Sequence, residues 1–310
     1  MARIRGFGAY LPVRVVDNAE IGPMCGADPV WIKQQTGIEQ RRWAAPGQMV
    51  ADMGVLAARD CLANCGEVAR EVGLVLVASG SSERRFPGPA ASIAAALGIA
   101  GKPAVDLPVA SAGTLFGLSL AADLVKHHGN VLVIGTEAMS RVIGLNPAYR
   151  DTAVLFGDGA GACLVSADTG FAEIRDSLLC SDGDFAEILR LDVDAPLYMD
   201  GRSVIMQVSR KLPRTIQELL DRNGRKASEI DAFLLHQANL NLITRVASVL
   251  GAEDSRFFRN LSKYGNTSSA SLLIAAAEWW QLVGAKMRGP IMLAAFGAGL
   301  NWGAMLLDPV

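Results

Sequence analysis

Hydrophobic residues occur along this chain in short runs that alternate with longer segments of helical periodicity. In the first half these stretches cover residues 72–78, 90–97, 104–109, 115–125, 131–134 and 155–165. Short apolar runs separated by helical segments are typical of α/β proteins whose central strands are buried on both faces. The pattern therefore predicts an α/β fold.

The second half of the chain repeats this alternation. It predicts strands at 230–235, 256–261, 291–295 and 301–307, with helices at 240–250 and 268–282. Each half also has a polar strand-to-helix turn at similar spacing, at Ser111 and at Asn266, and each closes with a glycine-rich turn. We infer an internal duplication, with residues 1–170 forming one half and residues 171–310 the other.

Composition narrows the class of protein. Apolar residues make up 51% of the chain, enough for a large core and a subunit interface. The formal net charge of −2, from 29 basic and 31 acidic residues, argues against binding to nucleic acid and to a charged membrane surface. The five cysteines contain no CxxC pair, which indicates free thiols in a reducing compartment and no metal site.

The first residues, MARIRGFGAYLPVRVVDN, interrupt their apolar positions with arginines and a proline, unlike a signal peptide. No segment reaches the length of uninterrupted apolar sequence that a membrane-spanning helix needs. We therefore expect a soluble cytoplasmic protein.

The segment LPVASAGTLFG at 107–117 places Ser111 between an apolar run and a helical pattern. Free N–H groups at the start of a helix can receive an oxyanion, and turns of this kind hold nucleophiles. Serine is equally a common helix cap. Residue-level reasoning thus leaves both a catalytic and a capping role open for Ser111.

Two further polar residues occupy similar turns. His236, in AFLLHQANLNLI, is the one histidine in an apolar setting, so it is either a base or a structural histidine at a helix start. Asn266, in KYGNTSSAS, has the alternative roles of a cap or a left-handed residue. A duplicated α/β unit would bring these turns and Ser111 together about a pseudo-twofold axis.

Five segments follow one another along the chain: VWIKQQTGIEQRRW (30–43), LFGDGAGA (155–162), HQAN (236–239), YGNTSSAS (264–271) and AFGAGLNWG (295–303). Taken together and in this order, they resemble the condensing enzymes of the thiolase fold, most closely β-ketoacyl-acyl carrier protein synthase III. The resemblance covers essentially the whole chain. It implies a thiolase-like duplicated αβαβα five-layer sandwich and a homodimer.

The resemblance also implies a reaction. An acyl group would pass from acyl-coenzyme A to residue 111 and then condense with a malonyl thioester, carried by an acyl carrier protein, with loss of carbon dioxide. His236 and Asn266 would hold the malonyl oxygen as enolate charge develops. The backbone N–H groups of Ser111 and Ala298 would form the oxyanion hole, and no cofactor would be needed.

By the same resemblance, other positions would bind substrate. Phe156 and Phe296 would line the site. Trp31 and Arg150 would embrace the adenine end of coenzyme A. Phe86, in RRFPGP, would reach from one subunit to the acyl pocket of its partner.

The chain departs from the family pattern at the nucleophile, where Ala110-Ser111-Ala112-Gly113 stands in place of a cysteine motif. A helix N-terminus can convert a thiol of pKa near 8.5 to its thiolate, whereas a serine hydroxyl is too weak an acid and needs a base, for which His236 is the candidate. Three explanations compete: a natural serine nucleophile, an engineered cysteine replacement, or an inactive subunit.

A second departure concerns the partner. The family has basic residues where this chain has Gln35, Met206, Asn241, Ser248 and Val249, so docking to an acidic carrier protein should be weaker and a different carrier is expected. Two alternative functions stay open. One is serine-dependent acyl transfer in secondary metabolism without condensation, and the other is a non-catalytic partner subunit of a heterodimeric synthase.

Overall fold

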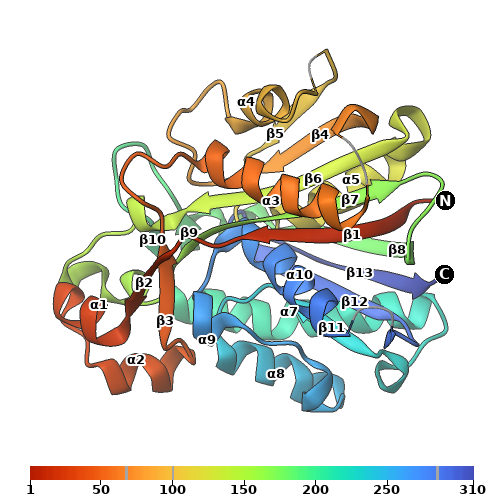
Figure 1. Cartoon of the computed structure of the whole chain (residues 1–310). Helices are drawn as coiled ribbons and strands as arrows, with labels where there is room; N and C mark the ends of the chain where they lie inside the picture. Colours follow the sequence, from red (N-terminus) through yellow and green to blue (C-terminus); the bar gives the residue numbers. More distant parts are fainter. Residues whose placement is uncertain (67–68, 100, 284–285) are drawn as a thin grey trace.

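The computed structural model describes residues 1–66, 69–99, 101–283 and 286–310. One sheet of nine strands runs through the described part of the chain (Figure 1). Its order is β11 (Ala232–Leu235), β12 (Ile291–Gly297), β13 (Asn301–Pro309), β8 (Ala172–Ser181), β1 (Arg3–Tyr10), β7 (Asp158–Ser166), β6 (Asn130–Ala138), β4 (Val72–Ala78) and β5 (Ala104–Leu107). Two small antiparallel pairs accompany it, β2 (Arg14–Asp17) with β3 (Gln40–Trp43) and β9 (Leu189–Arg190) with β10 (Tyr198–Met199).

The strands pair as the apolar runs require. In the first half β4 lies parallel to β5 and β6, and β7 runs antiparallel between β6 and β1. In the second half β11 is parallel to β12, which is antiparallel to β13. Strands β6, β7 and β12 are buried along almost their whole length, consistent with cover on both faces. The pairing of β1 with β8 joins the two halves.

Two helices lie between the halves of this sheet, α5 (Gly113–His128) and α10 (Ser271–Val283). Helix α10 is buried on nearly all sides, as a helix in a central layer must be. Helices α3 (Val50–Asn64) and α4 (Pro89–Ala96) cover the outer side of the first half, while α7 (Gly201–Arg222) covers the second half, with α8 (Leu240–Leu250) packed beside it. The predicted five-layered αβαβα architecture is therefore confirmed.

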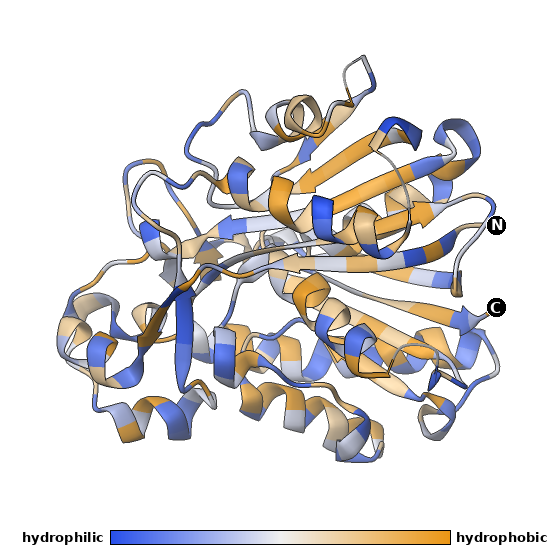
Figure 2. Ribbon diagram, viewed as in Figure 1, coloured by the Kyte–Doolittle hydropathy of each residue, from blue (hydrophilic) through white to orange (hydrophobic). Residues whose placement is uncertain are grey.

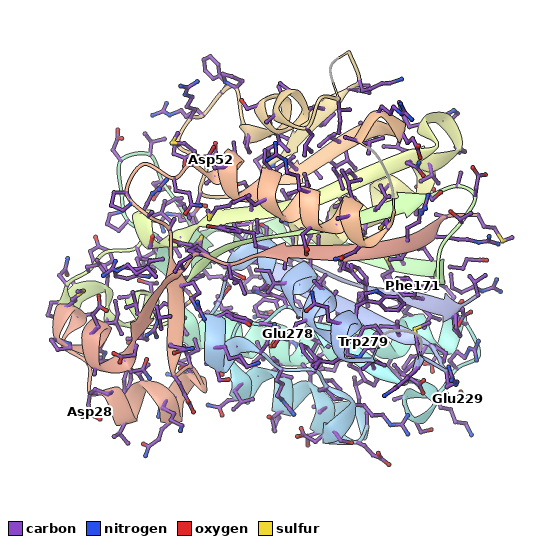
Figure 3. The ribbon with its side chains drawn as sticks, viewed as in Figure 1. Asp28, Asp52, Phe171, Glu229, Glu278 and Trp279 are labelled. Carbon is purple, nitrogen blue, oxygen red and sulfur yellow. The ribbon has the colours of Figure 1, made fainter. Side chains whose placement is uncertain are left out.

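Hydropathy follows these layers. Strands such as β4 and β12 are mostly hydrophobic, whereas β3 and many of the outer turns are hydrophilic (Figure 2). Aromatic packing closes one end of the central layer. There Phe171 stacks on Trp280 with ring centroids 3.8 Å apart, and Figure 3 places Phe171 at the end of the molecule where both termini emerge.

Short elements complete the described chain and shape the loops near the strand ends. The α-helices among them are α1 (Asn18–Cys25), α2 (Pro29–Thr36), α6 (Arg150–Ala153) and α9 (Leu261–Tyr264). The 3-10 turns are η1 (Ala69–Glu71), η2 (Met139–Arg141), η3 (Pro147–Tyr149), η4 (Gly183–Ile188), η5 (Ala227–Glu229), η6 (Asp254–Arg256) and η7 (Ser268–Ala270).

The strand predicted at 256–261 is wrong. Phe257 makes only an isolated bridge with Phe233, and its ring stacks on that of Phe233 with centroids 4.4 Å apart. Apolar side chains here fill the core without a hydrogen-bonded ladder, and the segment ends in α9. Asn266 accordingly follows a short helix rather than a strand. The predicted division at residue 170 falls in the connection between β7 and β8, and the duplication itself stays a prediction.

Candidate active site

Ser111 lies in the turn between β5 and α5, as the sequence pattern predicts. It has a φ of 62°, which few residues other than glycine adopt, and its side chain is buried. The adjoining turn can pack this closely because residue 297 is a glycine, whose Cβ, if present, would stand 1.9 Å from the carbonyl oxygen of Ala110. The strained turn directs Ser111 into a cavity of the protein.

A cluster of serines from the far half of the chain contacts Ser111. The N–H of Ser111 donates to the Oγ of Ser268 at 3.1 Å and to the Oγ of Ser269 at 3.0 Å. The Oγ atoms of Ser111 and Ser268 are 3.2 Å apart. The oxyanion role predicted for this N–H therefore requires a substrate oxygen to take the place of those hydroxyls as its acceptor, while the contact between the two Oγ atoms can remain.

His236 follows β11 and is 2% exposed. Its Nδ1 is hydrogen-bonded to the hydroxyl of Ser271, and its ring meets that of Phe296 edge to face with centroids 5.2 Å apart. Burial lowers the pKa of His236 to about 3. The imidazole is thus neutral near pH 7, with Nδ1 engaged by Ser271 and Nε2 left for chemistry.

Asn266 is held by its backbone and by one side-chain atom. Its N–H donates to the Leu155 carbonyl at 2.9 Å, and its Oδ1 accepts the Ser268 N–H at 2.9 Å. With Oδ1 engaged in the turn, the Nδ2 group is the donor that this side chain has left for a ligand. Asn266 is thus both a turn cap and a candidate binding group.

The residues expected at the reaction centre line one cavity. Ser111, His236 and Asn266 meet there, together with Ala298. Most of the wall is apolar, and its members include Met139, Leu155, Phe156, Leu197, Val204 and Phe296. This arrangement, a few polar groups in an apolar pocket, suits a hydrophobic chain attached to a reactive carbonyl.

A second groove adjoins this cavity, because Met199, Ile205 and Asn239 line both. Trp31 and Arg150 lie in the groove, with the Arg150 guanidinium carbon 4.7 Å from the centroid of the Trp31 ring. Since indole and guanidinium planes both stack on aromatic bases, the pair has the chemistry to hold a nucleobase.

Phe86 does not line the cavity. Its side chain is 85% exposed in the loop before α4, so any role of this ring depends on a second subunit.

A buried carboxylate behind the cavity was missed from the sequence. Glu137, at the end of β6, is fully buried and accepts hydrogen bonds from the N–H groups of Gly80, Ser81 and Ser269. Its place in the apolar run VLVIGTEA was the one clue, since a buried charge at a strand end needs several donors. Glu137 ties the serine cluster to β6.

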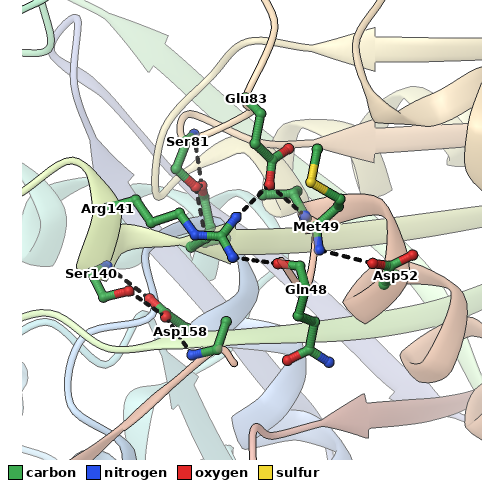
Figure 4. A network of polar contacts seen from close by, with 12 residues as sticks. Gln48, Met49, Asp52, Ser81, Glu83, Ser140, Arg141 and Asp158 are labelled. Carbon is green, nitrogen blue, oxygen red and sulfur yellow. Dashed lines mark hydrogen bonds and ion pairs between the residues drawn. The ribbon is translucent and has the colours of Figure 1, made fainter. Parts of the chain in front are cut away.

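A neighbouring polar network anchors the loop that carries Met139 into the cavity wall (Figure 4). Asp158 accepts hydrogen bonds from the N–H and the hydroxyl of Ser140, and burial raises the pKa of its carboxyl group. Arg141 pairs with Glu83 at 2.7 Å. These contacts fix 3-10 turn η2 against β7.

Among the residues that the structure describes, no cluster of three or more histidine, cysteine or acidic side chains has the geometry to hold a metal ion. In the same residues no helix combines the length and apolar character that crossing a membrane requires.

Comparisons with known proteins show the family to which this chain belongs. Residues 105–183 match the family 3-oxoacyl-[acyl-carrier-protein (ACP)] synthase III, and residues 220–308 match its C-terminal family. The β-ketoacyl-[acyl-carrier-protein] synthase III of Nitratidesulfovibrio vulgaris is 37% identical, with 98% of each chain covered.

Solved structures are similar over the full length. The 3-oxoacyl-[acyl-carrier-protein] synthase III of Aquifex aeolicus has a TM-score of 0.95 and 33% identity, covering 99% of this chain and 100% of its own. The priming β-ketosynthase of the R1128 polyketide pathway has a TM-score of 0.91 and 32% identity, with 100% and 97% covered.

The fold and its similarity to known proteins define a condensing enzyme of the thiolase-like α/β class. Within that class, the chain belongs to the 3-oxoacyl-[acyl-carrier-protein] synthase III family and is a transferase.

Proposed function

We propose that this enzyme transfers an acyl group from acyl-coenzyme A to the Ser111 hydroxyl and condenses it with a malonyl thioester. The observation that carries the proposal is the convergence of Ser111, His236 and Asn266 on one apolar cavity. The hydroxyl, the neutral imidazole and the amide donor are the groups that this reaction needs. No cofactor enters the reaction.

In the first step the Ser111 oxygen forms a bond to the thioester carbonyl, and the carbon–sulfur bond breaks. The Ser111 proton passes to Nε2 of His236 and then to the departing sulfur of coenzyme A. A histidine whose pKa lies at about 3 is an unprotonated base at pH 7, and it surrenders the proton readily to a thiolate.

In the second step the malonyl group loses carbon dioxide, and the electron pair of the broken bond becomes an enolate. The enolate carbon attacks the Ser111 ester, and Ser111 leaves with a proton taken up from solvent. Nε2–H of His236 and Nδ2–H of Asn266 would stabilise the enolate oxygen as charge develops.

His236 must therefore accept a hydrogen bond at Nε2 in one step and donate one there in the next. Its partner Ser271 allows both tautomers, because a hydroxyl can accept from Nδ1–H or donate to Nδ1. The Gln237 N–H also donates to this hydroxyl at 3.2 Å, which leaves the Ser271 proton available for the histidine.

Acyl-coenzyme A would enter through the groove that adjoins the cavity. Trp31 and Arg150 would hold the adenine of coenzyme A, while the apolar wall receives the acyl chain. The neutral residues at Gln35, Met206 and Val249 would favour a carrier protein that is less acidic than the usual family partner.

Intact-protein mass spectrometry with acyl-coenzyme A, followed by a malonyl thioester, tests the proposal. We expect an acyl adduct on Ser111 that disappears with release of carbon dioxide. An adduct that transfers to an oxygen or nitrogen acceptor without carbon dioxide would instead identify a serine-dependent acyltransferase. An adduct on another residue would overturn the assignment of Ser111.

If no acyl donor labels the enzyme, Ser111→Cys separates the remaining explanations. Rapid acylation of that variant alone would identify serine as a cysteine replacement. No acylation of either form, together with co-purification of a cysteine-bearing paralogue, would identify a non-catalytic partner subunit.

A further inference from the structure

Each hydroxyl around Ser111 has hydrogen-bond partners that show which group it accepts from and which it donates to. Ser268 is 1% exposed, and its Oγ accepts the Ser111 N–H at 3.1 Å. The same Oγ lies 3.2 Å from the Ser111 Oγ, where either oxygen can be the donor. Ser269, by contrast, donates its hydroxyl proton to the Val109 carbonyl at 3.2 Å. Among the described side chains that touch the Ser111 N–H, the Ser268 hydroxyl is the one that also contacts the Ser111 oxygen.

Ser268 is held in this position against its backbone preference. Its φ is 46°, a left-handed conformation that costs free energy for a residue with a side chain. The Asn266 Oδ1 holds the turn by accepting the Ser268 N–H at 2.9 Å. Glycine would adopt this φ with less strain, but it would lack the hydroxyl that contacts Ser111.

We propose that Ser268 is a further catalytic residue, whose hydroxyl donates a hydrogen bond to the Ser111 oxygen and stabilises it as it loses its proton. The inference rests on the proposed function in taking Ser111 as the nucleophile. Ser268 does not accept the Ser111 proton, which goes to His236 and then to the leaving sulfur. It retains its own proton throughout.

This arrangement answers the difficulty that a serine poses at position 111. A hydroxyl is a much weaker acid than a thiol, so its oxygen needs a donor that lowers the cost of the developing negative charge. With Ser268 as donor, the Ser111 proton is left free to point at the base. A thiolate at the same position would need this donor far less, because it is charged before it reacts.

The test measures the acylation rate of Ser111 by acyl-coenzyme A and its labelling rate by a fluorophosphonate, which bonds to an activated serine oxygen and expels fluoride. We expect Ser268→Ala to lower both rates by about tenfold to a hundredfold. Ser268→Gly, which relieves the strain at φ 46°, should lose the same activity, and urea unfolding verifies that both variants fold. In a Ser111→Cys background, we expect Ser268→Ala to change the acylation rate by less than about threefold.

Two controls separate the role of the hydroxyl from its surroundings. Ser269→Ala removes the other hydroxyl on the Ser111 N–H and should cost clearly less than Ser268→Ala. Ser119→Ala removes a hydroxyl from the distant pair of Ser119 with Ser177 and should leave both rates unchanged.

The outcomes distinguish this inference from the proposed function. Fluorophosphonate labelling that depends on Ser268, without any acylation by acyl-coenzyme A, would support the role of Ser268. It would overturn acyl-coenzyme A as the proposed source of the acyl group. Normal acylation in Ser268→Ala would retain the function and overturn the inference. Three other results would also overturn the inference about Ser268. They are an equal loss of acylation rate in the serine and cysteine backgrounds, faster acylation in Ser268→Ala, and a parent enzyme that reacts with neither reagent.

Discussion

At the scale of single residues, the chemistry of the site is set by burial. His236 has a pKa of about 3 because the charged imidazolium would be enclosed by apolar atoms and by the Phe296 ring. The same burial keeps the imidazole neutral over the physiological range. In the proposed reaction, the neutral His236 can therefore accept the Ser111 proton without carrying a charge beforehand.

The need for a base predicts how His236→Ala behaves. We expect the acylation rate of Ser111 to fall by about a hundredfold to a thousandfold, the usual contribution of a general base. In Ser111→Cys the same change should matter much less, since a thiol at a helix start can ionise without it. Single-turnover mass spectrometry measures both rates, and an equal loss in the two backgrounds would contradict the base role.

Burial of His236 also predicts a pH dependence of stability. Its folded-state pKa of about 3 lies below the ordinary value, so between about pH 6.5 and 3 the unfolded chain binds a proton that the folded chain does not. The free energy of unfolding should therefore fall as the pH is lowered through this window. Urea titrations should show a shallower fall in His236→Gln, and identical slopes would argue against a neutral buried histidine.

At the scale of secondary-structure elements, the site depends on how strand ends are tied to turns from the other half. Glu137 at the end of β6 gathers N–H groups from the loop after β4 and from η7. A single carboxylate thereby couples elements of both halves behind Ser111.

Replacing that carboxylate tests the coupling. Glu137→Gln would present an NH₂ group to donors at Ser81 and Ser269, so we expect a loss of about 2 to 3 kcal/mol in the free energy of unfolding. The exposed Glu187 provides the matched control, and Glu187→Gln should change stability by less than about 0.5 kcal/mol. Equal stabilities of the two variants would show that the network contributes little.

The groove formed by α2 and α6 carries a second prediction. Removing either stacking partner, in Trp31→Ala or Arg150→Ala, should raise KM for acyl-coenzyme A by about three- to thirtyfold with little change in kcat. Arg14→Ala breaks a similar pair, in which the guanidinium carbon lies 4.9 Å from the Trp43 ring, but outside the groove. An unchanged KM in the first two variants would place the entrance elsewhere.

At the scale of the whole molecule, one edge of the sheet remains open in the single chain. Strand β5 is the last strand on its side, Val105 within it is 44% exposed, and Phe86 stands out in the loop before α4. Open sheet edges with exposed apolar side chains pair readily with a second chain. We propose that two copies pair through β5, with Phe86 entering the partner.

Sedimentation at micromolar concentration tests this assembly. We expect a species of about 65 kDa, from two chains of 32.7 kDa. The double variant Phe86→Ser with Val105→Lys should shift it to the mass of one chain, because it removes an exposed apolar ring and places a charge on the exposed edge strand. Val249→Lys, at a residue 53% exposed on α8, serves as the control and should remain a dimer. A parent protein that sediments as a single chain would contradict the proposed dimer.

Patterns local in the chain were enough to predict most elements and to single out three candidate site residues that line one cavity. The helix expected at 240–250 is α8, with those bounds, and Ser111 lies in the expected turn. Both follow from periodicity over a few residues, where neighbours in sequence are also neighbours in space. The α/β class was predicted at this level, and Ser111, His236 and Asn266 became candidates there, while their catalytic roles came from the family resemblance.

The tertiary structure decided which side chains act together. Phe257 was expected in a strand, but packing against Phe233 satisfies its apolar ring without a ladder. Nothing in the local pattern distinguishes Ser268 from Ser269 or Ser271, yet Ser268 meets Ser111 across 157 positions of sequence. Contacts of this kind depend on how the layers pack. A serine has the same letter in the sequence whether its hydroxyl faces water or a nucleophile, so its surroundings are known only from the tertiary structure.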